Sequence, residues 1–390
     1  MADRDLDLDA PSLPEPGGGR RLPDLARFAL VLGLLYLFLV GVALLESGIE
    51  GLGSGFQDGL LESVSNPIAG VFAGILATVL VQSSSVSTST IVGLVGAGTL
   101  TIPAAVPMVM GANIGTTVTN TLASLGHMRR GEEFRRAFAG ATMHDFFNLL
   151  AVVVLLPLEL LTGFLSDSAQ AIADVLRGTG VQGGKTSSPI KEAVKAPAGA
   201  IESMVHGGLG ESTLAAVILL ALGLAAIFVA LTYITKNMRQ LVAGSVEKAM
   251  NRLIGRGGGA VGIIIGLLAT LAVQSSSITT SILVPLLGAG LLTLRSAYPI
   301  TLGANLGTTV TALLASLAVD LQAGLVVALT HTLFNATAIA IFYPIPGLRD
   351  LPIRLAQGLA DLAMRNRSLV VGYVGATFVA LPALVLLVAR

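Results

Sequence analysis

One polar motif occurs twice in the sequence, and this repetition constrains the fold more than any other feature. Residues 82–85 read Gln-Ser-Ser-Ser and return as residues 274–277, an offset of 192 (274 − 82). The match runs without a gap between residues 70–125 and 262–317, and 33 of these 56 aligned positions are identical by direct count. Identity at this level indicates an internal duplication, not merely a shared apolar composition.

Further repeated islands extend the duplication. Residues 96–98 return as Gly-Ala-Gly at the same offset, and residues 111–119 return as Gly-Ala-Asn-(Ile/Leu)-Gly-Thr-Thr-Val-Thr. Residues 141–148 then pair with 328–335 at an offset of 187 (328 − 141), and both copies contain a His and an Asn four residues later. Each half of the chain therefore carries the same polar motifs in the same order.

The composition places both halves in a membrane. Hydrophobic residues make up 53% of the chain and charged residues 12%, whereas a soluble domain carries about 25% charged residues. The mean hydropathy is +0.83, and the apolar runs approach the ~20 residues needed to cross a bilayer as a helix. A net charge of zero gives no basic surface for nucleic acid, and the absence of Cys excludes disulfides and thiolate sites. The sequence predicts an all-α polytopic membrane protein.

The chain divides into five predicted units. The N-terminal residues are acidic and then rich in Pro and Gly, which is typical of a disordered tail. The predicted units are this tail (1–23), a first transmembrane repeat (24–157), an extracytoplasmic inter-repeat loop (158–212), a second transmembrane repeat (213–343), and an amphipathic segment with a last transmembrane helix (344–390).

Each repeat is predicted to contain three crossings, a re-entrant hairpin and a broken helix. The hairpins, 68–97 and 261–291, have apolar arms too short to cross the bilayer on either side of Gln-Ser-Ser-Ser. The spans 102–125 and 294–317 are long enough, but the polar segments 111–119 and 303–311, which contain Gly-Thr-Thr, interrupt them. Because three is an odd number, the second repeat is expected to have inverted topology relative to the first.

The basic residues predict the orientation. Arg and Lys gather in the N-terminal flank and in segments 127–136, 236–256 and 349–367, which the crossing count puts on one side. The positive-inside rule makes that side cytoplasmic, so we expect a multi-pass protein of the cell (inner) membrane. With the last span, 369–388, the count is seven crossings, which puts the C-terminus outside.

The polar residues at mid-membrane suggest a transport site. Gln, Ser, Thr and Asn are costly in hydrocarbon unless they are paired, and helix breaks expose N–H groups that attract anions and carbonyls that can ligate a cation. Residues 70–125 contain no Asp, Glu, Lys or Arg, and residues 262–317 contain only Arg295. A multivalent anion bound there would lack a fixed counter-charge, so we expect it to move only together with cations.

Several other interpretations were open. Ser and Thr commonly join transmembrane helices, although a duplicated set favours a site. His144 and His331 are candidates as ligands or proton carriers, but a buried His bonded to a neighbouring backbone group is the favoured interpretation. An intramembrane Ser/His hydrolase would need a nucleophile elbow, and no Gly-x-Ser-x-Gly occurs at the Ser clusters. We therefore expect no enzyme activity, and a passive channel suits hairpins at mid-membrane less well than a transporter.

These motifs resemble the type II sodium-dependent phosphate cotransporters. The duplicated Gln-Ser-Ser-Ser is joined by Phe-Arg-Arg-Ala-Phe-Ala-Gly-Ala-Thr at 134–142 with His-Asp at 144–145, Leu-Leu-Pro-Leu-Glu at 155–159, and Tyr-Pro-Ile-Pro at 343–346 with Pro-Ile-Arg-Leu-Ala at 352–356. Segment 158–212 has no Cys and no Asn-x-Ser/Thr acceptor, which favours a bacterial member.

The resemblance implies sodium-coupled symport of inorganic phosphate into the cell by alternating access, with phosphate held between the two Gln-Ser-Ser-Ser tips. Co-transported sodium ions and the lipid bilayer are the other expected partners, with no organic cofactor and no nucleic acid. A symporter of another oxyanion or carboxylate is the alternative, and the sodium:phosphate ratio and a homo-oligomer stay open. The phosphate candidates are Gln82, Ser83, Ser84, Ser85, Asn113, Thr116, Ser275, Ser276, Ser277 and Asn305, and the sodium candidates are Gln274, Ser275, Thr308 and Thr311.

Overall fold

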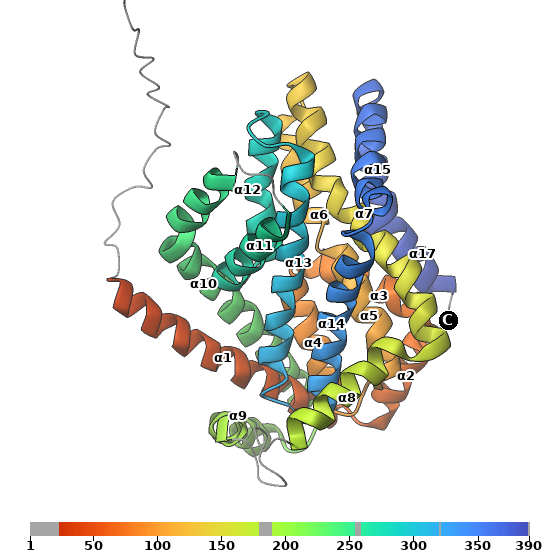
Figure 1. Ribbon diagram of the computed structural model, residues 1–390. Helices are drawn as coiled ribbons and strands as arrows, with labels where there is room; N and C mark the ends of the chain where they lie inside the picture. Colours follow the sequence, from red (N-terminus) through yellow and green to blue (C-terminus); the bar gives the residue numbers. More distant parts are fainter. Residues whose placement is uncertain (1–22, 179–188, 254–258, 320, 389–390) are drawn as a thin grey trace, which may run out of the picture.

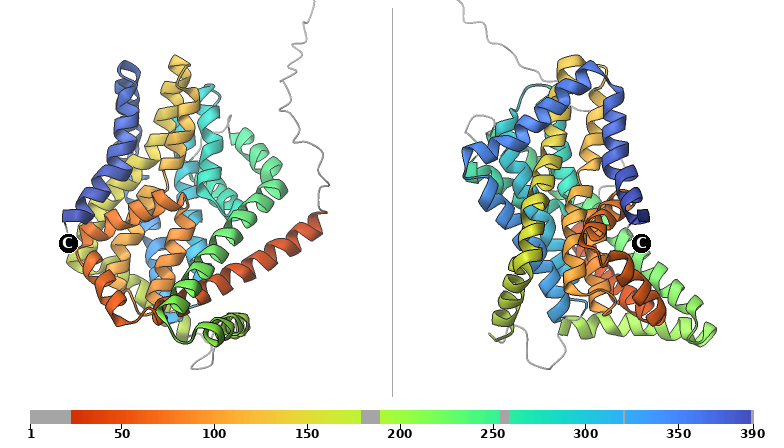
Figure 2. Two further views of the ribbon diagram at one scale, coloured as in Figure 1. Left: turned by 180° about the vertical axis from the view of Figure 1, so that it is seen from behind. Right: turned by 90° about the vertical axis from the view of Figure 1, so that its right-hand side faces the viewer.

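The computed structural model describes residues 23–178, 189–253, 259–319 and 321–388, and the secondary structure within these ranges is entirely helical (Figure 1). The α-helices pack into one bundle, with α8 and α9 at one end and the start of α7 and α15 at the other (Figures 1 and 2). The elements are α1 (Asp24–Gly51), α2 (Ser54–Val64), α3 (Pro67–Val81), α4 (Ser84–Gly96), α5 (Ile102–Gly115), α6 (Val118–Ser124), the 3₁₀-helix η1 (Leu125–His127), α7 (Gly131–Thr162), α8 (Phe164–Gly178), α9 (Pro189–Leu209), α10 (Thr213–Leu253), α11 (Gly259–Val273), α12 (Ser276–Gly288), α13 (Leu294–Ala315), α14 (Leu321–Phe342), α15 (Pro346–Arg365), α16 (Ser368–Gly375), the π-helix η2 (Ala376–Ala380) and α17 (Leu381–Val388).

Two helical hairpins carry the repeated polar motif at their turns. The first consists of α3 and α4, the second of α11 and α12, and arms of 13 and 15 residues are about 20–22 Å long at 1.5 Å per residue. That is shorter than the ~30 Å hydrocarbon core of a bilayer. Helical hairpins are therefore present with bounds close to those expected, and their re-entrant course in the membrane stays a prediction. We call residues 82–85 the first tip and residues 274–277 the second tip.

The two tips have the same backbone conformation. Gln82 and Gln274 are both left-handed with φ of 56°, a conformation that costs roughly 1–2 kcal/mol for a residue other than Gly. Each side chain turns back onto the helix that precedes it: Gln82 Nε2 donates to the Val79 carbonyl at 2.6 Å, and Gln274 Nε2 donates to the Leu271 carbonyl at 2.8 Å. These bonds satisfy a carbonyl at each helix end and offset part of the cost.

The first arm of each hairpin lies against the helix that follows the hairpin. A Cβ on Gly74 of α3 would lie 2.0 Å from the Met108 carbonyl oxygen of α5, and a Cβ on Gly111 would lie 1.9 Å from a carbonyl of α3. The corresponding residues of α11 and α13, Gly266 and Gly303, show the same backbone contact at 1.9 Å. Only Gly permits such an approach, and small residues of this kind let membrane helices pack closely.

Five helical segments of the described chain are long and apolar enough to cross a bilayer. They contain residues 25–51, 131–162, 213–238, 322–342 and 368–388. A sixth span results if α2 and α3, which are bent by 105°, are taken together. The polar helix α13 is 22 residues long but is not among the five. The chain is a multi-pass membrane protein, and the count of seven crossings stays a prediction.

The predicted break in the polar span of the second repeat is wrong. Helix α13 continues without interruption through Thr308 and Thr309. In the first repeat α5 and α6 are separate, but Thr116 and Thr117 keep helical dihedral angles of −57°, −31° and −80°, −17°. The Thr116 hydroxyl donates to the Ala112 carbonyl at 2.9 Å, and Thr308 does the same to a carbonyl four residues earlier at 3.2 Å. Because these hydroxyls are satisfied within the helix, neither helix has to unwind.

The connection between the repeats is largely helical. Within the predicted loop 158–212, the described residues form the end of α7, α8 and α9. The buried carboxylate of Glu159 accepts hydrogen bonds from the N–H groups of Leu165 at 2.6 Å and Ser166 at 3.3 Å, which satisfies the start of α8. The predicted tail lies almost entirely outside the described residues. The bounds of the predicted units stay expectations.

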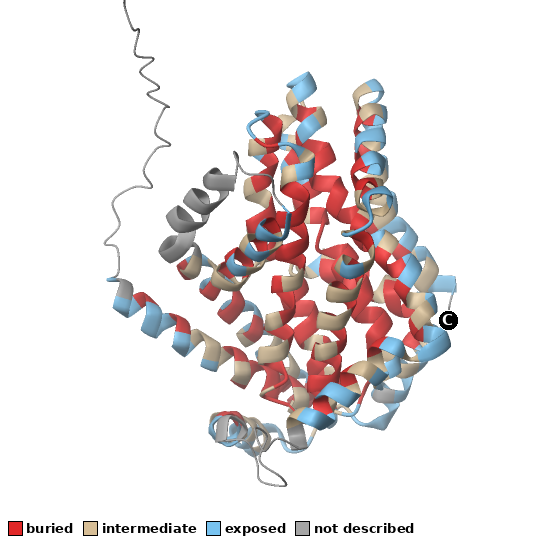
Figure 3. Cartoon of the chain, in the orientation of Figure 1, coloured by how far each residue is buried: buried red, intermediate tan, exposed pale blue. Residues whose placement is uncertain are grey.

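Buried residues fill the centre of the bundle, whereas the outer faces of α1, α8 and α17 are exposed (Figure 3). Many exposed side chains are large and apolar, for example Leu25, Leu161 and Leu387 at 81%, 84% and 69% exposure. Such faces suit contact with lipid, where apolar exposure carries no penalty. Of the tip residues, Ser84, Ser85 and Ser276 are buried, whereas Gln82 is exposed.

Candidate functional site

Each tip presents the N-terminus of a helix. Ser83 and Ser275 are the N-caps of α4 and α12, and their hydroxyls accept the N–H groups of Val86 at 3.3 Å and Ile278 at 3.4 Å. The other N–H groups of the first turn have no partner within the helix, and the helix dipole makes this end partly positive. Two helix N-termini of this kind can bind an anion.

The serines of the first turn supply further donors. Ser84 and Ser276 are buried at 7% and 2% exposure, and Ser85 is buried at 7%. Ser277, the counterpart of Ser85, is half-buried. The two hairpins, residues 67–96 and 259–288, contain no Lys, Arg, Asp or Glu. The donors at the tips are therefore hydroxyls and backbone N–H groups without a fixed positive charge.

Thr311 of α13 joins the two tips. The Ser85 hydroxyl of the first tip donates to Thr311 Oγ1 at 3.4 Å, and the Thr311 hydroxyl donates to Gln274 Oε1 of the second tip at 3.4 Å. The residue equivalent to Thr311 in the first repeat, Thr119, donates only to Gln82 Oε1, at 3.4 Å. One threonine therefore contacts both repeats, while its counterpart stays within its own repeat.

The sodium candidates contribute only oxygen atoms. Thr308 and Thr311 are buried and lie three residues apart, so they share a face of α13. The Thr308 hydroxyl is bonded to its own helix, and the Ser275 hydroxyl caps α12. Their oxygens keep lone pairs, and hydroxyl and amide oxygens are atoms that hard cations accept as ligands. The assignment of these residues to a sodium site stays a prediction.

A second link between the repeats lies farther along α12. Asn120 of α6 donates from Nδ2 to Thr280 Oγ1 at 2.6 Å, and Ser281 donates to Asn120 Oδ1 at 2.9 Å. Asn120 and Thr280 are buried. This contact ties the second arm of the second hairpin to the helix that follows the first hairpin.

Asn113 and Asn305 belong to a buried network of amides. Asn305 Nδ2 donates to Asn335 Oδ1 at 2.6 Å and to Asn148 Oδ1 at 2.8 Å. Asn113 Oδ1 accepts from Asn335 Nδ2 at 3.3 Å and lies 3.3 Å from His331 Nε2. The network joins α5, α7, α13 and α14. Both phosphate candidates thus have side-chain partners of their own, and His331 lies in the same network.

Asp145 is a buried acidic residue that the sequence analysis did not include among the candidate site residues, although residues 141–148 were compared with 328–335. Its side chain in α7 is 3% exposed, and its Oδ2 accepts from the Thr121 hydroxyl at 3.2 Å and the Tyr373 hydroxyl at 2.8 Å. Among the described residues no basic group forms an ion pair with it. A carboxylate beside a His within an apolar span was the available signal. Its counterpart in the second repeat is Thr332.

These features define a class of protein. Helical hairpins with polar turns, buried hydroxyl and amide oxygens and two helix N-termini without a charged residue are typical of secondary transporters. The helices and hydropathy add that the chain is a multi-pass membrane protein.

Comparison with known proteins gives the family. The chain belongs to the Na+/Pi-cotransporter family, whose model matches residues 37–181 and 226–342. It is 34% identical over 459 residues to sodium-dependent phosphate transport protein 2A of Ovis aries, covering 97% of this chain and 71% of that protein. It is also 34% identical over 449 residues to protein 2A of Rattus norvegicus (95% and 70%) and 34% identical over 448 residues to protein 2B of Homo sapiens (92% and 64%).

No solved structure was found to match the chain. The family consists of cotransporters, so the alternative of an intramembrane hydrolase is excluded and the protein is not classed as an enzyme. The resemblance of the sequence motifs to sodium-dependent phosphate cotransporters is confirmed at the level of the family. The bacterial origin stays a prediction.

Proposed function

We propose that this protein is a sodium-coupled symporter of inorganic phosphate in the cell membrane and that it works by alternating access. The printed names of its relatives describe sodium-dependent phosphate transport. The observation that carries the proposal is the pair of helix N-termini at the repeated Gln-Ser-Ser-Ser turns, in hairpins without a charged residue. Inversion of the second repeat is part of the proposal.

Phosphate binds the N-terminal ends of α4 and α12. The hydroxyls of Ser84 and Ser276 and the free N–H groups of the first turns donate to its oxygens. A phosphate dianion taken from water into this site loses much of its hydration, and hydroxyls and dipoles alone offset little of that cost. Sodium bound close by supplies the missing positive charge, so the two ions move together.

Sodium is held by Gln274, Ser275, Thr308 and Thr311. Thr311 is the central member, because its oxygen contacts both Ser85 of the first tip and Gln274 of the second tip. A cation bound there would therefore stabilise the arrangement in which the two tips are joined. This gives a physical route from sodium binding to a phosphate site formed by both tips.

Asp145 is the candidate for a further cation. An ionised carboxylate that is buried without a basic partner is costly, and sodium or a proton would neutralise it. Its hydroxyl partners, Thr121 and Tyr373, provide oxygens that a sodium ion can use as ligands. The sodium:phosphate ratio therefore depends on whether this residue binds sodium during the cycle.

The alternative substrate is another oxyanion or a carboxylate, since helix N-termini accept several kinds of anion. Competition separates the cases: excess unlabelled phosphate should abolish uptake of labelled phosphate, and sulfate or succinate should leave it unchanged. Inhibition by sulfate or succinate at equal concentration would assign the site to a broader class of anions.

Purified protein in liposomes tests the proposal. We expect uptake of labelled phosphate with an inward sodium gradient and none when choline replaces sodium. Ser84→Ala and Ser276→Ala should each weaken apparent phosphate affinity roughly ten- to hundredfold, because a lost donor to a charged group costs about 1.5–3 kcal/mol. Ser166→Ala, in α8 with its hydroxyl bonded to the Gly163 carbonyl, is the matched control. Equal uptake in sodium and choline, or unchanged affinity in both tip variants, contradicts the proposal.

A further inference from the structure

An arginine of the first repeat holds the base of the second hairpin. Arg136 of α7 donates from Nε to the Leu287 carbonyl at 3.2 Å and from Nη2 to the Gly288 carbonyl at 2.6 Å. These are the last two carbonyls of α12, at the negative end of its dipole, and the Leu287 carbonyl also accepts the Gly290 N–H at 3.0 Å. The guanidinium carbon also lies 3.7 Å from the position of a Cβ on Gly290. It therefore fills the turn that ends the second hairpin.

The same turn ends the first hairpin. Gly98 and Gly290, which are 192 residues apart, are left-handed with φ of 68° and 76°. The N–H of Gly98 bonds to the Val95 carbonyl at 3.0 Å, and the N–H of Gly290 bonds to the Leu287 carbonyl at 3.0 Å. The backbone that receives the guanidinium in the second hairpin is thus present in the first hairpin too.

The residue equivalent to the arginine in the second repeat is Ala323, at the offset of 187 found in the sequence. Packing of the next residue supports this register. Ala137 packs on Val284 of α12, and its counterpart Gly324 lies beside Val92 of α4, 3.4 Å from a Cβ position on the glycine. Val92 and Val284 are themselves 192 residues apart. In each repeat, the residue that follows Arg136 or Ala323 therefore packs on the equivalent valine in the second arm of a hairpin.

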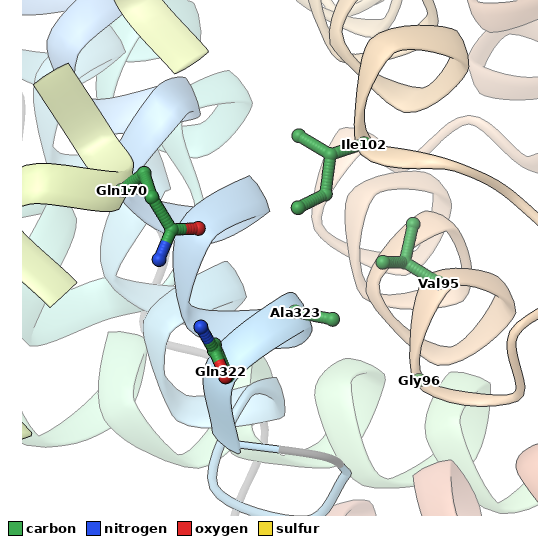
Figure 4. Close-up of a pocket in the computed structure, with 6 residues that line it drawn as sticks. All are labelled: Val95, Gly96, Ile102, Gln170, Gln322 and Ala323. Carbon is green, nitrogen blue, oxygen red and sulfur yellow. The ribbon is translucent and has the colours of Figure 1, made fainter. Parts of the chain in front are cut away.

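A hollow occupies the place of the guanidinium in the first hairpin. Its volume is about 380 Å³, and no described atom lies within 4 Å of a Cβ position on Gly98. Figure 4 shows the Ala323 methyl between the two glutamine side chains and the end of α4. The lining residues are Val95, Gly96, Ile102, Gln170, Gln322 and Ala323, of which Val95 and Gly96 are the counterparts of Leu287 and Gly288.

Charged contacts also join neighbouring helices on the face that carries Arg136. Arg135 of α7 pairs with Asp361 of α15, and Arg295 of α13 pairs with Asp350 of α15 at 2.7 Å. All six ion pairs formed between two described residues involve only residues 127–135, 295 and 349–361. Within the described chain, ion pairs therefore join helices on the face that carries Arg136. The hollow lies beside the base of the first hairpin.

We propose that Arg136 is a positioning residue that latches the base of the second hairpin to α7, and that the first hairpin lacks this arginine contact because Ala323 stands in the equivalent place. The inference rests on the proposed alternating-access function. The latch favours the conformation described here, in which the second hairpin is closed against α7. Opening on the arginine-rich face requires that its hydrogen bonds break, whereas the first hairpin opens without an equivalent step.

The absence of Cys from the chain allows a direct test with one reporter. Ser281→Cys changes one atom in α12, at the contact with Asn120 that lies between the second tip and the latched base. In inverted and right-side-out membrane vesicles, its labelling rate by an impermeant maleimide measures access from each face. We expect Arg136→Ala to raise labelling from the arginine-rich face roughly tenfold, as loss of charge-assisted hydrogen bonds shifts a two-state equilibrium.

Three further variants make the test specific. Millimolar guanidinium chloride should return Arg136→Ala to the wild-type rate, because free guanidinium can occupy the same carbonyls, and Arg136→Lys should be intermediate. Ala323→Arg should latch the first hairpin and also raise labelling from the arginine-rich face. Because this variant retains Arg136, it tests the proposal even if Arg136→Ala does not fold. Arg135→Ala removes the same charge from the neighbouring position and breaks the pair with Asp361 of α15, but it touches no hairpin, so it should change labelling much less than Arg136→Ala does.

The outcomes separate the latch from the transport function. Equal labelling of the Arg136→Ala and wild-type proteins, or equal changes in Arg136→Ala and Arg135→Ala, overturns the latch even if phosphate uptake is normal. Lack of rescue by guanidinium overturns it as well. Because labelling requires no substrate, a wild-type protein that takes up no phosphate refutes the proposed function but leaves the labelling comparison valid.

Discussion

Replacing Thr311 by Val tests whether the threonine that joins the two tips is a sodium ligand. Val keeps the shape of the side chain and removes its oxygen. Both hydrogen bonds of this hydroxyl are 3.4 Å long, near the upper limit for such bonds, so their loss alone should cost at most about 1 kcal/mol. Loss of an oxygen from a bound cation should cost about 1.5–3 kcal/mol, which is a roughly ten- to hundredfold rise in the sodium concentration for half-maximal uptake.

The assay is phosphate uptake into proteoliposomes at increasing sodium concentration. Thr119→Val is the matched control, because Thr119 occupies the equivalent position and contacts only Gln82 of its own repeat. We expect its sodium dependence to stay within about twofold of the wild type, since one long hydrogen bond is lost. A similar rise in both variants, or no rise for Thr311→Val, would refute the reasoning that places sodium at the junction of the tips.

Three further predictions concern coupling and stability. Because coupling free energy between two sites is reciprocal, calorimetry should show that sodium raises phosphate affinity by the same factor as phosphate raises sodium affinity; equal phosphate binding in sodium and choline would contradict the proposed counter-charge. Glu159→Ala should lower the free energy of unfolding by about 1–2 kcal/mol through loss of the cap on α8, measured by thermal unfolding in detergent with the exposed Glu132→Ala as control. The Arg135 guanidinium lowers the pKa of Asp361 below its ordinary value of 3.8. The ion pair therefore stabilises the fold at a pH above 3.8, and this stabilisation is lost as the pH falls through the lowered pKa. Arg135→Gln should therefore lower the melting temperature at about pH 6 and have a smaller effect at about pH 3; an effect independent of pH would contradict this.

The hairpins could be predicted because local signals define them. Apolar arms of limited length enclose Gln-Ser-Ser-Ser, and Gly-Ala-Gly ends each hairpin. The expected bounds, 68–97 and 261–291, differ by one to three residues from those of α3 with α4 and α11 with α12. The repeat made the prediction stronger, since the same pattern had to hold twice.

The remaining features depend on contacts that a local pattern does not contain. The Gly-Thr-Thr segments favoured a broken helix, but their hydroxyls bond within the helix and α13 stays intact. The contact between Ser85 and Thr311 joins residues 226 positions apart, and that between Asp145 and Tyr373 joins residues 228 apart. Such contacts depend on how helices that are far apart in the sequence pack against each other. Comparison of the two repeats also directed attention away from Asp145, because its counterpart is Thr332.

The glycine contacts between backbones limit how the protein can move. At Gly74 and Gly111, and again at Gly266 and Gly303, the main chains of two helices touch without a side chain between them. Close-packed surfaces of this kind do not deform continuously, so neither hairpin arm can slide along its neighbour without a clash. Helices α3 and α5 must therefore move together as one rigid body, and so must α11 and α13. The left-handed glutamines and the turns beyond α4 and α12 are then places where the hairpins can bend.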